Sequence, residues 1–105
     1  MSKYHNVPTS HDGILFASKK ECNRFTELKM LERSKIISRL ELQKAFPLIV
    51  NGVKLGKYIA DFCYLDLDGR EVVEDVKSEP TKTAVYRIKC KLMIALYGIR
   101  IVEVM

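Results

Sequence analysis

The middle of the chain constrains the fold most, because strand-like stretches there are separated by two turn signals. Asn51-Gly52 suits the left-handed positions of a tight β-hairpin turn. Asp68-Gly69 marks a second turn further along. The flanking residues alternate between apolar and polar, as expected of strands with one buried face. The pattern predicts three consecutive strands, at residues 40–50, 55–66 and 71–77.

Helical spacing occurs on both sides of these strands. Ser18 followed by Glu21 has the spacing of a helix capping box, and apolar residues follow at intervals of three. We therefore expect a first helix over about residues 18–34. A second helix is expected over about residues 82–97, because Gly98 suits the left-handed position that ends a helix. Its predicted buried stripe consists of Val85, Ile88, Leu92, Ala95 and Leu96.

The two ends of the chain complete the expected fold. Residues 1–13 show little apolar periodicity and contain the Asp12-Gly13 turn signal, so we expect an extended arm. Residues 99–104 are expected to form a short, buried strand. The order helix, three strands, helix, strand predicts one α/β domain, with a mixed sheet flanked by helices.

Charge and hydropathy limit the possible partners. Lys and Arg number 18 against 13 acidic residues, and the formal net charge of +5 mildly favours a polyanion such as nucleic acid. The apolar runs are far shorter than the ~20 residues that a membrane-spanning helix needs. The N-terminus lacks the apolar core of a signal peptide. We expect an intracellular protein with no membrane partner.

The second turn also predicts a register between two strands. Asp66 and Asp68 suit a type I turn, and Gly69 suits the left-handed residue that follows it. This three-residue loop would place Asp61 opposite Asp75. A two-residue turn would instead shift the register by one and send the two carboxylates to different faces. The turn residues favour the three-residue loop.

Asp61, Asp75 and Lys77 form the candidate chemical site. Asp61 interrupts an otherwise apolar strand, where an unpaired carboxylate is costly. Asp75 and Lys77 are two residues apart and so lie on one face of their strand. Two facing carboxylates repel, and a hard divalent cation such as Mg²⁺ or Mn²⁺ would relieve that repulsion. The alternative is a surface ion pair between Asp75 and Lys77, with Asp61 at a solvated strand end.

The sequence resembles the PD-(D/E)XK nuclease superfamily, and more closely a family of small phage-encoded proteins assigned to it. The D…(D/E)-x-K signature occurs here together with the superfamily's order of helices and strands, a restriction-endonuclease-like αβββαβ core. The resembling segments are Lys3–Asn6, Asp12–Glu21, Leu40–Gln43, Ala60–Phe62, Val73–Lys77 and Tyr86–Lys91.

The resemblance implies a role for each residue of the site. Asp61 and Asp75 would bind the metal ion, together with the Val76 carbonyl. Lys77 would position the nucleophile. The acid next to Asp75, Glu74, is a competing ligand, and strand alternation with Lys77 favours Asp75.

Two further residues match positions near the family's site. Glu21 corresponds to the acid that the first helix often contributes, although a helix cap explains it equally well. Phe25 and Leu28 lie on the same helical face, which directs Glu21 inward. Gln43 matches a polar residue that some members place near the site, and a plain sheet-edge glutamine is the alternative.

Basic residues at two places are candidates for DNA contact. Arg87 and Lys91 lie four apart on the second helix, with Lys82 nearby, although a solvated helix face explains such charges as well. The N-terminal arm is the second place, through Lys3 and His5.

The resemblance implies a Mg²⁺- or Mn²⁺-dependent DNA endonuclease, which would act in the host cytoplasm if the protein is phage-encoded. A structure-selective nuclease such as a Holliday junction resolvase would fit a phage recombination context. A mismatch-repair-type nicking endonuclease and an inactive nucleic-acid-binding module are the alternatives. So small a domain would need a homodimer to cut both strands.

Overall fold

The computed structural model describes residues 9–11, 13–77 and 82–105. The predicted DNA contacts Lys3 and His5 lie outside the described residues. The elements are, in order, β1 (Thr9–His11), β2 (Ile14–Phe16), α1 (Lys19–Arg33), β3 (Ser38–Val50), β4 (Val53–Leu65), β5 (Glu71–Val76), α2 (Ala84–Tyr97) and β6 (Val102–Val104). Part of the expected N-terminal arm therefore forms β1, which pairs with β2.

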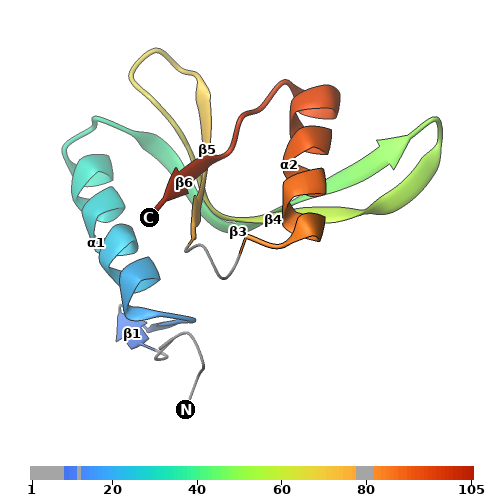
Figure 1. Ribbon diagram of the computed structural model, residues 1–105. Coiled ribbons are helices and arrows are strands. Elements are labelled where there is room, and N and C mark those ends of the chain that lie inside the picture. The colour runs from blue at the N-terminus through green and yellow to red at the C-terminus, as the bar shows by residue number, and fades with distance from the viewer. Residues whose placement is uncertain (1–8, 12, 78–81) are drawn as a thin grey trace.

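The main sheet is mixed and lies between the two helices (Figure 1). Its strand order is β3-β4-β5-β6, with antiparallel pairs except for the parallel pair of β5 and β6. Two apolar clusters form, one with α1 on one face of the sheet and one with α2 on the other. The expected α/β class, with a mixed sheet flanked by helices, is confirmed. In the described residues, no helix is long and apolar enough to cross a membrane.

The ends of the helices follow the predicted local chemistry. Ser18 caps α1, because its side chain accepts a hydrogen bond from the Glu21 amide at 3.1 Å. Thr83 caps α2 in the same way, with the Tyr86 amide as donor. Gly98 ends α2 with φ of 68°, in the left-handed region where glycine carries no steric penalty.

The stripe that we predicted to be buried on α2 is mostly exposed. Val85 is 62% exposed and Ile88 58%, whereas Tyr86 and Met93 are buried against the sheet. Helical spacing is shared by both sets, so periodicity alone could not distinguish the face that packs. The last strand is also shorter than expected and is not fully buried, since Val102 is 47% exposed.

The predicted register between β4 and β5 is confirmed. Phe62 lies opposite Glu74, and Leu65 lies opposite Glu71. The turn between them is a three-residue loop, in which the Gly69 amide donates to the Asp66 carbonyl at 3.0 Å. Gly69 has φ of 78°, and the Asp66 carboxylate accepts hydrogen bonds from two backbone amides of the loop. Continuing this register places Asp61 opposite Asp75.

Strand β4 changes faces at Asp61. Ala60 packs in the cluster under α2, yet Phe62 packs in the cluster under α1. A regular strand would place these two residues on the same face. Gln43, at the facing position of β3, has φ of 54°, outside the β region. Because the backbone is irregular here, Asp61 lies outside the regular pairs between β4 and β5.

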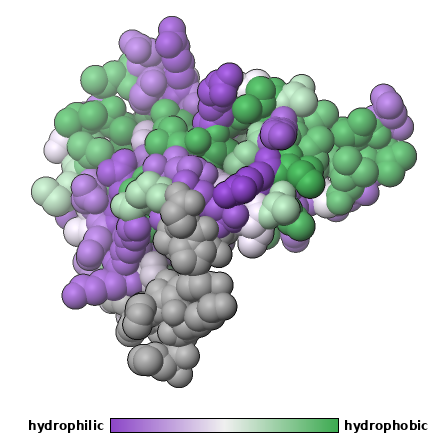
Figure 2. Space-filling view, viewed as in Figure 1, coloured by the Kyte–Doolittle hydropathy of each residue, from purple (hydrophilic) through white to green (hydrophobic). Residues whose placement is uncertain are grey.

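The far half of the β3–β4 hairpin projects beyond α2 (Figure 1). Figure 2 shows this projecting end as a largely hydrophobic surface. Ile49, Val53 and Leu55 are among its exposed apolar residues. The hairpin turn at Asn51 and Gly52 has positive φ at both positions, as the Asn-Gly signal predicted.

Candidate active site

The candidate site lies where β4 and β5 separate. The ladder between them ends at Phe62 and Glu74. Beyond that pair, the Asp61 amide donates to Asp75 Oδ1 at 2.9 Å, and the Val76 amide donates to Asp61 Oδ2 at 2.9 Å. Each carboxylate thus satisfies a backbone amide that has lost its ladder partner. The two predicted acids are brought together, and the hydrogen bonds fix their positions.

Glu21 and Gln43 join Asp61 on one side of this point. The three residues line a hollow of about 320 Å³. Gln43 Nε2 lies 3.3 Å from Asp61 Oδ1, so the amide orients the carboxylate. Glu21 uses its backbone amide for the helix cap and presents its side chain to the hollow. The cap and the site are therefore compatible roles for Glu21.

Asp75 and Lys77 share a second hollow, of about 400 Å³, beside α2. Lys77 Nζ lies 4.5 Å from the centre of the Tyr86 ring, a cation–π contact. The predicted alternation along β5 is confirmed, because both side chains line the same hollow. Asp61 does not line it, since its strand changes faces there.

Negative charge is poorly compensated around these carboxylates. Burial raises the pKa of Glu21 to about 7, assisted by the charges of Asp61 and Asp75 and opposed by Lys77. Burial also raises the pKa of Asp75 to about 6, against the stabilising hydrogen bond from the Asp61 amide. Such surroundings favour a proton or a bound cation.

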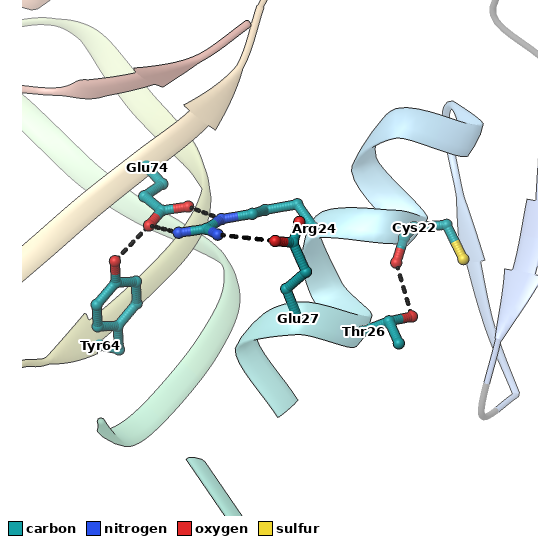
Figure 3. A network of polar contacts seen from close by, with 6 residues as sticks. All are labelled: Cys22, Arg24, Thr26, Glu27, Tyr64 and Glu74. Carbon is teal, nitrogen blue, oxygen red and sulfur yellow. Dashed lines mark hydrogen bonds and ion pairs between the residues drawn. The ribbon is translucent and has the colours of Figure 1, made fainter. Parts of the chain in front are cut away.

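Glu74, the acid next to Asp75, belongs to a buried hydrogen-bond network on the face of the sheet that α1 covers (Figure 3). Its carboxylate accepts hydrogen bonds from Arg24 at 2.8 and 2.7 Å and from the Tyr64 hydroxyl. The Glu74 side chain is 1% exposed, and this bidentate pair joins α1 to β5. Glu74 is therefore a structural residue, which leaves Asp75 as the candidate ligand.

The donor atoms fit a hard divalent cation in chemistry, because they are carboxylate oxygens. Asp75 Oδ2 and the Glu21 carboxylate accept no hydrogen bond from any described residue. Among the described residues, however, no three His, Cys, Asp or Glu side chains lie close enough together to hold a metal ion. Two carboxylates, with the Val76 carbonyl, are the available set.

The predicted DNA contacts on α2 and just before it differ in their surroundings. Arg87 and Lys91 are exposed on the helix. Lys82 instead forms an ion pair with Glu103 at 3.0 Å. Its charge is therefore partly neutralised within the protein.

Glu103 is a residue that the sequence did not point to. It pairs with Asp75 across the parallel strands and contributes to raising the Asp75 pKa. Its carboxylate also accepts a hydrogen bond from the Tyr86 hydroxyl at 2.8 Å. An acid between Val102 and Val104 was the available signal, but the pairing partner of a parallel strand is not encoded locally.

The fold and the site define an α/β protein with a pair of aspartates, Asp61 and Asp75, where two central strands of a mixed sheet separate. The chain belongs to the family described as "Protein of unknown function (DUF1064)", whose model matches residues 1–101. Searches of curated proteins and of solved structures found no match.

Proposed function

We propose that this protein is a metal-dependent DNA endonuclease with a PD-(D/E)XK active site. The observation that carries the proposal is the pair of hydrogen bonds that fixes Asp61 and Asp75 where β4 and β5 separate, with Lys77 two residues beyond Asp75. The proposal is also supported by the elements that follow β2, since α1, β3, β4, β5, α2 and β6 come in the order expected for an αβββαβ core.

Each residue has a distinct role in this proposal. Asp61 and Asp75 would hold Mg²⁺ or Mn²⁺ with the Val76 carbonyl, and Glu21 would be the further acid that the first helix contributes. The bound cation would supply Lewis-acid activation of water and of the phosphoryl group. The Lys77 ammonium would hold the nucleophilic water and donate to a phosphoryl oxygen. Gln43 keeps the Asp61 carboxylate oriented.

Two other functions are alternatives to this proposal. A nucleic-acid-binding module without activity would need basic residues, but not a half-buried Asp61 and a buried Asp75 beside a lysine. A nicking endonuclease shares the same chemistry and differs in its substrate and in the number of strands cut. Paired cuts at a four-way junction would require a second copy of the chain, so a homodimer is part of the junction-resolvase version.

The test is to incubate the purified protein with four-way junction, flap, mismatched, linear and single-stranded DNAs. Reactions with Mg²⁺ or Mn²⁺ are compared with reactions in EDTA. Cleavage that needs the metal ion and is lost in Asp61→Asn supports the proposal. Thermal stabilisation of the wild-type protein by Mn²⁺, absent in Asp61→Asn, gives a second readout that does not depend on activity. No cleavage of any substrate, together with no stabilisation by the metal ion, would refute it.

A further inference from the structure

The Lys77 ammonium contacts an aromatic ring. Its Nζ lies 4.5 Å from the centre of the Tyr86 ring, within the range of a cation–π contact. Among the described residues, no acidic side chain forms an ion pair with Lys77, and its Nζ has no hydrogen-bond partner. Lys44, which lies 5.3 Å from the centre of the Phe46 ring, differs because it also pairs with Glu71 at 3.0 Å. Within the described part of the chain, the Tyr86 ring is thus the contact that orients the Lys77 ammonium.

The Tyr86 ring is itself fixed by three elements of the fold. Its backbone amide donates to the hydroxyl of Thr83, the N-cap of α2, at 3.1 Å. The Tyr86 hydroxyl donates to Glu103 Oε2 on β6 at 2.8 Å. The ring packs beside the Tyr58 ring of β4, with centroids 6.4 Å apart, and Tyr86 is 8% exposed. The ring cannot turn without losing these contacts, so the tertiary structure sets its position.

The Tyr86 hydroxyl also engages an acid that could otherwise pair with Lys77. Glu103 pairs with Asp75 across the parallel strands β5 and β6. Both of its carboxylate oxygens are engaged, Oε2 by the Tyr86 hydroxyl and Oε1 by the Lys82 ammonium at 3.0 Å. A lysine ammonium has three N–H donors, and the face of a ring does not neutralise its charge as a carboxylate would. The Lys77 charge therefore stays available to an anionic group.

We propose that Tyr86 is a positioning residue, which holds the Lys77 ammonium in the hollow that both residues share with Asp75. This inference rests on the proposed function for the reaction that Lys77 serves. Lysine carries its charge on a flexible four-carbon stem with a large rotamer entropy. A fixed ring under the ammonium reduces the freedom that Lys77 must lose when it acts on water and the phosphoryl group. Tyr86 acts through Lys77 and not on the substrate.

The first test compares single-turnover cleavage rates in Mg²⁺ with DNA affinities in EDTA. Tyr86→Leu should lower the rate about tenfold and leave the DNA affinity within about twofold, because the contact acts on the reacting lysine and not on the duplex. Tyr86→Phe keeps the ring face and should retain most of the rate.

Tyr97→Leu is the matched control for the loss of a tyrosine from α2. The Tyr97 ring packs against Phe46, and its hydroxyl donates to the Pro47 carbonyl at 2.6 Å, but the residue lies outside the hollow. This variant should therefore lose stability without losing cleavage rate. Urea unfolding of all three variants measures the stability separately.

The second test is spectroscopic and needs no activity. In protein with ¹³C-labelled lysine, the ε-methylene signal of Lys77 should lie upfield of that of exposed Lys54, because the ring current shields it. Lys77→Arg assigns the signal. The upfield shift should persist in Tyr86→Phe and Tyr97→Leu and disappear in Tyr86→Leu. A nuclear Overhauser contact between the Lys77 ε-protons and the Tyr86 ring, measured in the wild-type protein, decides the matter if Tyr86→Leu does not fold.

The outcomes separate this inference from the proposed function. A wild-type Lys77 signal with neither the shift nor the contact, or a shift that survives in Tyr86→Leu, would overturn the inference even if the protein cleaves DNA. Equal losses of rate in Tyr86→Leu and Tyr97→Leu, or in Tyr86→Leu and Tyr86→Phe, would overturn the role of the ring. No cleavage by the wild-type protein would refute the nuclease proposal, and the spectroscopic test would still decide whether Tyr86 holds Lys77.

Discussion

The Asp61 amide donates a hydrogen bond to the Asp75 carboxylate, while the Asp61 carboxylate accepts one from Val76, the residue after Asp75. Each carboxylate thus accepts a hydrogen bond from a backbone amide of the facing strand, at a point where the regular ladder between β4 and β5 has ended. Backbone amides thus hold both carboxylates in place. This relationship fixes both acids at the point where β4 and β5 separate.

Asp75→Asn should abolish cleavage while keeping the fold. The carboxamide oxygen can still accept from the Asp61 amide, but the negative charge that would hold a cation is lost. Because such a cation is worth several kcal/mol, we expect a fall of about a thousandfold or more in the cleavage rate. Single-turnover assays measure the rate, and circular dichroism checks the fold. A rate within threefold of wild type, roughly 0.7 kcal/mol by the same relation, would rule out Asp75 as a ligand.

Lys77→Ala should reduce cleavage and leave most DNA affinity, because the ammonium acts on the water and the phosphoryl group rather than on the duplex. Rates and anisotropy binding curves, measured on the same junction substrate, separate the two effects. Lys54→Ala, which removes an exposed lysine from β4, is the control and should cleave normally. Normal turnover in Lys77→Ala would remove this lysine from the mechanism.

The metal-free protein should lose stability as pH rises from about 4.5 to about 7. The folded-state pKa of Glu21, about 7, lies above its ordinary value of 4.5, so the folded state binds the extra proton. Its contribution is fully present below pH 4.5 and disappears as pH rises through 7. Melting temperatures of wild type and Glu21→Gln, compared across this range, should differ in slope. Parallel curves would contradict the raised pKa.

Gly69→Val should destabilise the fold through the turn alone. Gly69 has φ of 78°, and a Cβ atom at this position would meet nothing within 4 Å, so the cost of adding a Cβ is backbone strain. We expect a loss of about 1–2 kcal/mol or more, since β-branched residues adopt this conformation rarely. Urea unfolding measures the loss. Asp68→Asn is the control and should be mild, because Asn suits the same position.

Arg24→Met should be strongly destabilising, since it leaves the buried Glu74 carboxylate without its bidentate partner. Removal of one member of a buried pair costs about 3–5 kcal/mol. Arg24→Met/Glu74→Leu should recover much of this loss, because both charges are then gone. Unfolding free energies of the two variants test the prediction. A single variant as stable as wild type would show that the pair adds little to the α1–β5 contact.

The sequence by itself determined the features that depend on a few adjacent residues. Ser18 and Gly98 marked helix ends, and Asp66, Asp68 and Gly69 determined a three-residue loop. That loop in turn fixed the register that brings Asp61 opposite Asp75. Local hydrogen bonds and allowed φ values decide such features, so they can be predicted without knowledge of the rest of the fold.

Only the tertiary structure decided which distant residues meet. Both apolar faces of α2 have helical spacing, and docking on the sheet chose the one with Tyr86 and Met93. Glu103 lies beside Asp75 because β5 and β6 pair in parallel. Glu74 forms an ion pair with Arg24 and is therefore not a candidate metal ligand. These contacts join residues far apart in the chain, and their free energy depends on the burial of whole surfaces rather than on local conformation.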